Sequence, residues 1–441
     1  MFVTTAPENA RGRLSDDSTE IIRATLPLIG ENINAITPVF YKKMFTAHPE
    51  LIADTFNRGN QKSGEQQKAL AASIATFAAM LVDDNAPDPV DMLSRIGHKH
   101  VSLGITEDQY QIVHDNLFAA IVEVLGEDVV TAPVAAAWDE VYWLMAEVLV
   151  NFERDLYRSA GVEDGQVFTT AELVARRDLP GNAVEFTFRL AEMADQFAAA
   201  KPGQYVSIGV RLPDGARQLR QYSLISHPST ATFGIAVQRD GEVSSFLLDS
   251  LSVGEPVDAT LPAGDLVLSE EPGPVVLVSQ GIGSTPMVGM LQALAARVAE
   301  QADTAGDAVE NTDTAGDAAE NTDTAGDDTD AADPEVGHSA GDEVVVLHAD
   351  SSEADHAQAA LMTALTQRIG AHYVPVYRDQ GTRVDLAELQ RGGVLKKNAK
   401  WYLCGGNGFL QDVRAQLAEH PELEPAGVHF ELFSPNDWLI S

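Results

Sequence analysis

The chain has 441 residues, a formal net charge of −37 and a single cysteine, Cys404. This length predicts two to four domains, and the charge argues against a nucleic-acid partner, because phosphate binding needs clustered Lys and Arg. One cysteine excludes an internal disulfide or a cysteine-ligated cluster, and it suits a reducing compartment. No run of about 18 apolar residues occurs. We therefore expect a cytoplasmic protein without stable membrane association.

The first part of the chain has helical periodicity. Ser15 can cap a helix with apolar residues at helical spacing, and Pro27 within that pattern predicts a late start or a kink. Further helices are expected over residues 66–81, 90–103, 106–125 and 133–157. After a flexible arm over residues 1–14, residues 15–158 therefore predict an all-α, globin-like domain.

His100 lies in this region at the end of the segment 90–103. Haem iron needs a strong axial ligand, and a neutral imidazole provides one. His98 points to another side of the same helix, so the two cannot both bind one iron. A single helical histidine can equally be structural, so the haem interpretation depends on the residues around it.

Those residues form a pattern: Phe40-Tyr41-Lys42-Lys43-Met44-Phe45, Asp54-Thr55-Phe56-Asn57, Asn60-Gln61, Gln66, His98-Lys99-His100 and Asp108-Gln109-Tyr110. The pattern resembles the globin half of the flavohaemoglobins. The resemblance implies that His100 is the proximal ligand of haem b and that Tyr110 and Glu153 hydrogen-bond its imidazole, which strengthens it as a ligand. The remaining implied roles are oxygen binding by Tyr41 and Gln66, pocket closure by Leu70, packing on the porphyrin by Phe56, and a propionate contact by Lys99.

Three of these residues have plainer interpretations. Tyr41 can be a core aromatic residue, Glu153 a solvated charge at a helix end, and Lys99 a surface lysine.

Beyond residue 166 the pattern changes to that of strands. Strands are expected over residues 166–177, 184–190, 204–212, 257–260 and 266–268. Residues 166–272 therefore predict a small antiparallel β-barrel.

This segment contains Lys201-Pro202-Gly203-Gln204-Tyr205 and Arg220-Gln221-Tyr222-Ser223. The second motif resembles the Arg-x-Tyr-Ser pattern of ferredoxin-reductase-like flavoproteins. Arg220 can neutralise a diphosphate, Tyr222 can stack on an isoalloxazine ring, and Ser223 can hydrogen-bond its edge. By the resemblance Tyr205 contacts the adenine side of FAD, and a helix beginning at Gly241-Glu242-Val243-Ser244-Ser245 offers N–H groups to the pyrophosphate.

Residues 273–441 predict an α/β domain for NADH or NADPH. A buried parallel strand over 274–279 leads into Gly281-Ile282-Gly283-Ser284-Thr285-Pro286 and a helix over 287–299, the order that a pyrophosphate requires. A strand over 343–349, a helix over 354–369, a strand over 372–377 and a last strand from residue 400 follow.

Two motifs near the end of the chain complete the resemblance. Cys404-Gly405 resembles the reductase pattern beside the nicotinamide, and Glu431-Leu432-Phe433-Ser434-Pro435 resembles the segment in which an aromatic residue, here Phe433, covers the flavin. Glu431 is placed to affect the flavin or haem potential, or is a surface carboxylate. The chain departs from the family at Gly406, where a proline is usual, and at Ser434, where a glycine is usual.

An acidic repeat interrupts this domain at about residues 300–343, with 15 acidic residues and no Lys or Arg. Its low hydrophobicity and high charge predict a disordered insertion, and it lacks the ligand spacing of a calcium loop. Because an NADP pocket needs a cation at the ribose 2′-phosphate, the absence of Lys and Arg between Arg297 and Arg368 favours NADH.

The whole resemblance implies a monomeric nitric oxide dioxygenase acting on small molecules. NAD(P)H would reduce FAD, FAD would reduce haem, and the oxygen-bound ferrous haem would convert nitric oxide to nitrate. The alternatives are an oxygen-binding or sensing globin with an attached haem reductase, and a haem-assisted hydroperoxide reductase. Turnover of nitric oxide at saturating O2 distinguishes them.

Overall fold

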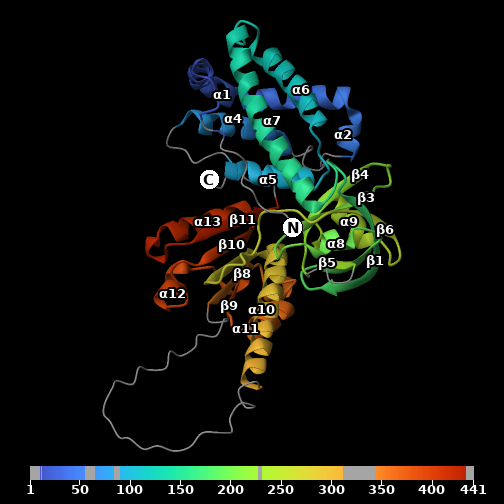
Figure 1. Ribbon diagram of the computed structural model, residues 1–441, viewed down its shortest axis with the longest axis vertical. Coiled ribbons are helices and arrows are strands. Elements are labelled where there is room, and N and C mark those ends of the chain that lie inside the picture. The colour runs from blue at the N-terminus through green and yellow to red at the C-terminus, as the bar shows by residue number, and fades with distance from the viewer. Residues whose placement is uncertain are drawn as a thin grey trace, which may run out of the picture.

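The computed structural model describes residues 10, 12–54, 65–83, 90–226, 231–310 and 343–433, with side chains at 53–54, 65–72, 90–91 and 302–310 left out. A helical domain lies above two β-containing domains (Figure 1). Most of the predicted arm over 1–14 and most of the predicted acidic insertion lie outside the described residues. At the end of the arm, Arg13 pairs with Glu147 at 2.7 Å.

The helical domain consists of α1 (Asp16–Ala47), α2 (Pro49–Asp54), α4 (Glu65–Val82), α5 (Val90–Val101), α6 (Asp108–Leu125) and α7 (Ala132–Ala160). The Ser15 side chain caps α1 by accepting from the Ser18 N–H. Pro27 lies inside α1 and does not delay its start, so of the two expected effects the late start was wrong. Apolar side chains at helical spacing on α1, among them Ile22, Ile29 and Ile36, are buried in one core with side chains of α6 and α7.

The second domain is a six-stranded antiparallel sheet. Its strands are β1 (Phe168–Leu179), β2 (Ala183–Leu190), β3 (Tyr205–Arg211), β4 (Arg217–Ser223), β5 (Thr232–Gln238) and β6 (Pro256–Thr260), in the order β4-β3-β6-β1-β2-β5. A bridge between Leu224 and Ile235 joins the two ends of this order, as a barrel requires. Two short helices, α8 (Ala194–Ala198) and α9 (Glu242–Asp249), accompany it.

Sequence patterning missed two of these strands and predicted one that is absent. β4 and β5 were not expected, and residues 266–268 form no strand. β4 escaped detection because its burial does not alternate, with three consecutive half-buried residues, Arg220 to Tyr222. These three residues line the pocket described below, which explains why the usual alternation of strand burial fails there.

The third domain has a parallel sheet in the order β11-β10-β7-β8-β9. The strands are β7 (Val275–Gln280), β8 (Val344–Asp350), β9 (His372–Tyr377), β10 (Lys400–Gly405) and β11 (Gly427–Leu432). The helices are α10 (Ser284–Glu310), α11 (Ala359–Ile369), α12 (Leu386–Arg391) and α13 (Asn407–Ala418). Buried side chains of α10 and α11 form one core against the sheet, and those of α12 and α13 form another, so helices cover both faces. Helix α10 extends to Glu310 (Figure 1), so residues 300–310 of the predicted disordered insertion are helical.

Helix α5 forms the seam between the helical domain and the other two. Ser94 Oγ donates to Asp265 Oδ2 of the barrel domain at 3.1 Å, and the Gly264 N–H donates to His98 Nδ1 at 3.2 Å. The Arg95 guanidinium carbon lies 3.5 Å from the ring centroid of Phe430 on β11. The helix that carries His100 is therefore fixed against both neighbouring domains. None of the described helices combines the length and apolar composition needed to cross a membrane.

Candidate functional site

His100 lies at the end of α5, and its ring is anchored from one side. Its Nδ1 lies 2.7 Å from Glu153 Oε1 on α7 and 3.0 Å from the Tyr110 hydroxyl on α6. Because a carboxylate only accepts hydrogen bonds, the proton is on Nδ1, which donates to Glu153 Oε1. In this tautomer the lone pair of the ring is on Nε2. The His100 side chain is 29% exposed, whereas that of Glu153 is 3% exposed. The arrangement leaves Nε2 suited to bind a metal ion.

Tyr110 and Glu153 form a buried hydrogen-bonded pair behind His100. The Tyr110 hydroxyl donates to the same carboxylate oxygen, Glu153 Oε1, at 2.5 Å. Burial and the neighbouring Glu153 carboxylate hold the pKa of Tyr110 well above its usual value, so the phenol keeps its proton. The Tyr142 hydroxyl donates to the Tyr110 carbonyl at 2.6 Å and fixes the start of α6. A buried carboxylate that accepts from both His100 and Tyr110 is held in one position relative to the imidazole.

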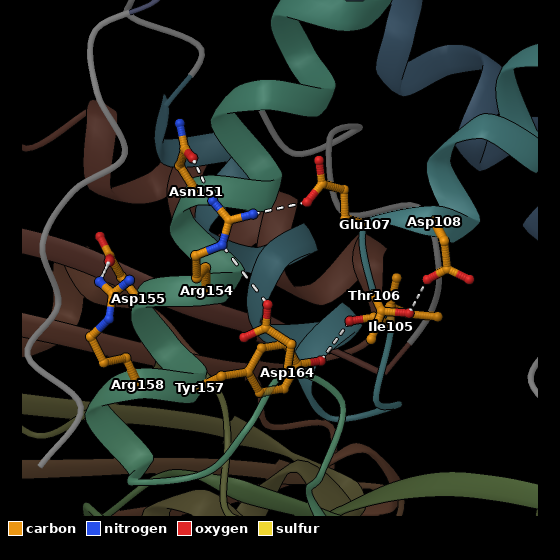
Figure 2. A network of polar contacts seen from close by, with 10 residues as sticks. All are labelled: Ile105, Thr106, Glu107, Asp108, Asn151, Arg154, Asp155, Tyr157, Arg158 and Asp164. Atoms are coloured by element: carbon orange, nitrogen blue, oxygen red, sulfur yellow. Dashed lines mark hydrogen bonds and ion pairs between the residues drawn. The ribbon is translucent and has the colours of Figure 1, made fainter.

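A network at the surface fixes the loop that joins His100 to Tyr110 (Figure 2). The Tyr157 hydroxyl donates to the Ile105 carbonyl at 2.6 Å. Arg154 Nη2 lies 2.9 Å from Glu107 Oε2, and its Nε lies 3.8 Å from Asp164, which follows α7. The carboxyl-terminal half of α7 therefore holds the loop between α5 and α6 and also carries Glu153, so one helix helps to position both partners of the imidazole.

The described residues contain only part of the predicted distal side of this pocket. Tyr41 is buried on α1, with its ring 4.6 Å from that of Phe40 and 5.5 Å from that of Phe45. Gln66 and Leu70 belong to α4, but their side chains lie outside the described part of the structure, and Phe56 lies outside it altogether. Their roles remain predictions.

A second site is a cavity of about 240 Å³ at the meeting point of the three domains. It brings together most of the residues that the sequence assigned to flavin binding. Lys99 of α5, which was predicted to contact a haem propionate, also lines it. The predicted residues that line it are Lys99, Tyr205, Arg220, Gln221, Tyr222, Ser223, Gly241, Val243, Ser244, Ile282, Thr285, Glu431, Leu432 and Phe433.

Several residues that line this cavity make polar contacts with neighbouring groups. Arg220 Nη1 donates to the Leu219 carbonyl at 2.7 Å, and its Nη2 lies 3.5 Å from Glu242. Ser244 Oγ accepts from the Gly241 N–H at 2.9 Å at the start of α9. Burial raises the pKa of Tyr222, so its hydroxyl stays a neutral donor. The walls thus combine a cation, a helix N-terminus and a neutral phenol, which suits a flat aromatic group attached to phosphates.

The glycine turn packs directly against the end of β10. Gly281–Gly283 forms a single 3₁₀ turn between β7 and α10, and a Cβ on Gly283 would lie 2.5 Å from the Cys404 carbonyl oxygen. The close approach of the two segments therefore requires glycine at position 283. It places Cys404 and Gly405 beside the turn, which leads directly into the first residues of α10, Ser284 to Pro286. Burial and the nearby Glu431 raise the pKa of the Cys404 thiol far above its usual value, so the cysteine is no thiolate nucleophile.

Phe433 is 53% exposed at the rim of the flavin-type cavity. Ser434 and Pro435, which follow it, lie outside the described residues.

Comparison with known proteins covers almost the whole chain. The Globin family model matches residues 39–149. The flavohemoproteins of Bordetella parapertussis and Bacillus subtilis are 35% and 31% identical, covering 95% and 96% of this chain and 98% of each relative. The crystal structure of flavohemoglobin from Malassezia yamatoensis, with bound FAD and heme, is 30% identical, has a TM-score of 0.76 and covers 96% of this chain and 100% of that one.

The chain belongs to the flavohemoprotein family. This confirms the resemblance and the predicted fold class of a helical globin domain, an antiparallel barrel domain and an α/β domain of the ferredoxin-reductase type.

Within this flavohemoprotein fold, the cavity also has lining residues that sequence reasoning did not assign to a site. They are Arg95, His98, Leu103, Leu219, Ala236, Gln238, Asp240, Gly264 and Asp265. Arg95, His98 and Leu103 come from the globin domain, so no motif of the barrel domain could have pointed to them. His98 is buried, and burial lowers its pKa. Its Nδ1 accepts from the Gly264 N–H of the barrel domain, and the residue lines the flavin-type cavity.

Proposed function

We propose that the protein is a nitric oxide dioxygenase that uses NAD(P)H, FAD, haem b and O2 to convert nitric oxide to nitrate. One observation carries the proposal. A histidine with a carboxylate-anchored Nδ1 lies on the helix that also contacts the flavin-type cavity. An iron ligand and a flavin site that share one helix suit electron transfer between them.

The residues present fit both prosthetic groups. The Nε2 of His100 is suited to haem iron, because its Nδ1 is already occupied by Glu153. Arg220, Tyr222 and the start of α9 line a cavity suited to FAD. When bound, FAD would split the electron pair of the nicotinamide into single electrons, and haem would bind O2 and supply the oxidising chemistry.

The chain's own residues contribute binding, orientation and electron density. Glu153 draws the Nδ1 proton of His100 toward itself and makes the imidazole a stronger donor at Nε2. Tyr110, donating to the same oxygen, holds the carboxylate and limits its charge. On the distal side, the role we assign to Tyr41 is to donate a hydrogen bond to the bound gas, and Gln66 would assist it.

The α/β domain supplies the reducing nucleotide. The glycine turn and the first turn of α10, which includes Thr285, provide N–H groups for a pyrophosphate. Gly405 packs closely beside this turn, because a Cβ there would lie 2.9 Å from the Phe409 ring and 3.0 Å from the Gln280 side chain. Phe433, at the rim, would cover the flavin until the nicotinamide displaces it.

The test is anaerobic and aerobic consumption of nitric oxide by the purified protein with NADH. We expect consumption only with O2, with nitrate as product and two molecules of nitric oxide used per nucleotide, because a hydride carries two electrons and each dioxygenation uses one. A protein that oxidises NADH but consumes nitric oxide no faster than the His100→Ala variant would contradict the proposal. Hydroperoxide-dependent NADH oxidation of equal efficiency would favour the alternative reductase.

A further inference from the structure

A carboxylate lies at the carboxyl end of β8, beside the glycine turn. β7 leads into that turn, and β8 is its parallel neighbour, paired from Val275 with Val344 to Gln280 with Ala349. Asp350 is the next residue and ends β8. In dinucleotide-binding sheets, the end of the strand next to the glycine turn is where the adenosine ribose lies. A carboxylate there accepts from the 2′-hydroxyl, and an arginine there binds a 2′-phosphate.

The Asp350 carboxylate is held in place and ionised. Its Oδ1 accepts from the Ser351 N–H at 2.7 Å, and its Oδ2 lies 3.5 Å from His348 Nε2. Burial alone would raise the pKa of Asp350, but contacts with His348 and the Ser351 N–H outweigh it and hold the pKa below its usual value. The Asp350 side chain is 10% exposed, so it is not fully enclosed at the carboxyl end of β8.

A buried hydrogen-bond network of residues on and beside β8 contacts this carboxylate, and none of these residues belongs to the sites described above. Ser279 Oγ lies 2.9 Å from His348 Nδ1. A neutral His348 that accepts there carries its proton on Nε2, on the side of Asp350. The ring of His356 stacks on His348 with centroids 3.7 Å apart, and its Nδ1 lies 3.3 Å from the Tyr377 hydroxyl. Both histidines are fully buried, and together they fix the direction of one carboxylate.

Arg378 is a cation that could favour a 2′-phosphate here, but its charge is more exposed to solvent than that of Asp350. Arg378, which follows β9, donates from Nη2 to Ser351 Oγ at 2.9 Å, so a positive charge does reach this edge from a part of the chain beyond Arg368. The Arg378 side chain is exposed, and solvent and salt screen an exposed charge more than a fixed and largely buried one. For a 2′-phosphate, repulsion by Asp350 would therefore outweigh attraction by Arg378.

We propose that Asp350 makes this chain selective for NADH over NADPH, by accepting a hydrogen bond from the ribose 2′-hydroxyl and by repelling a 2′-phosphate. The proposal rests on the proposed function, because it requires the nucleotide to lie across the carboxyl ends of β7 and β8. We expect the wild-type chain to prefer NADH on the order of 100-fold in kcat/KM, since a like-charge contact in a partly buried site has an effect of this size.

The experiment compares wild type with Asp350→Asn, Asp350→Glu and Arg378→Gln in the full-length holoprotein. Two quantities are measured: kcat/KM for flavin reduction by NADH and by NADPH, and the affinities of ADP-ribose and 2′-phospho-ADP-ribose by calorimetry. Asp350→Asn should lower the NADH preference in both measurements by about tenfold or more, as expected for loss of a charged partner. Asp350→Glu should retain most of the preference, and it keeps the charge if Asp350→Asn folds poorly.

The outcomes separate the specificity from the function. A wild-type chain that uses NADPH as well as NADH, or an Asp350→Asn ratio within about twofold of wild type, would overturn the role of Asp350. If Arg378→Gln alone changes the ratio, the arginine is the determinant. Reduction of flavin by neither nucleotide, together with no binding of either analogue, would overturn both this proposal and the proposed function. Normal nitric oxide turnover without a preference for NADH would overturn only the role of Asp350 and would leave the proposed function intact.

Discussion

The hydrogen bond between His100 and Glu153 should set the reduction potential of the haem iron. Nδ1 of His100 donates to Glu153 Oε1 at 2.7 Å, and the carboxylate is almost completely buried. The charge-assisted bond is therefore not screened by water. Electron density passed to the imidazole stabilises oxidised more than reduced iron. In Glu153→Gln, the acceptor oxygen stays in place but its charge is lost.

The size of the effect follows from the contact. A hydrogen bond to a charged group contributes about 1.5–3 kcal/mol and a neutral one about 0.5–1.5 kcal/mol, so the substitution removes about 1 kcal/mol from the oxidised state. For a one-electron step this corresponds to about 40 mV. We therefore expect the haem midpoint potential of Glu153→Gln to rise by about that amount, measured by spectroelectrochemical titration of the Soret band.

Tyr110→Phe provides a matched control with the opposite sign. The Tyr110 hydroxyl donates to the same oxygen at 2.5 Å, and removing it leaves more of the carboxylate charge for His100. The haem potential should then fall, while the flavin potential from the same titration stays constant in both variants. Shifts of the same sign in the two variants, or no shift beyond about 10 mV where about 40 mV is expected, would refute the reasoning.

Four further outcomes test other parts of the molecule. His100→Ala should lose the Soret band while retaining FAD, and added imidazole should restore haem binding; an unchanged spectrum would remove His100 as ligand. Arg220→Ala should weaken FAD binding by about 10- to 100-fold in a fluorescence titration of the apoprotein, because a charge-assisted contact is lost. Gly283→Ala should destabilise the α/β domain by about 1–3 kcal/mol in thermal unfolding, because the new Cβ would lie 2.5 Å from a backbone oxygen. The control Gly408→Ala should not destabilise it, because no atom lies within 4 Å of a Cβ there. The pKa of His356 is lowered by burial to about 3 from 6.5, so only the unfolded chain binds this proton between those values; stability should fall as pH drops from 6.5 toward 3, and less steeply in His356→Leu.

Local patterns predicted those parts of the site whose chemistry lies in neighbouring residues. Arg220 to Ser223 lie on one strand and face one cavity, and Gly281 to Gly283 form one turn. In both, sequence spacing alone brings the side chains or N–H groups together. Pairing His100 with Tyr110 and Glu153, in contrast, came from resemblance to relatives, because the three residues lie on three helices and no periodicity relates them.

Three predictions from the sequence differ from the structure. Pro27 was expected to delay or kink α1, and the delay was wrong: the helix starts at Asp16, because tertiary contacts of its apolar face can outweigh one lost hydrogen bond. The strand β4 was missed because its middle residues face a cavity and are only half-buried. Composition placed the start of the acidic insertion at about residue 300, but α10 continues to Glu310.

The sequence alone determined that three domains follow one another, and it predicted which residues of each carry chemistry, since composition, period and short motifs are properties of neighbouring residues. Only the tertiary structure decided that α5 touches both reductase domains, that Arg95 and His98 complete a cavity formed mainly by another domain, and that Asp350 is supported by two stacked histidines. These contacts join residues far apart in the chain, and their formation depends on how whole domains pack rather than on any local preference of the backbone.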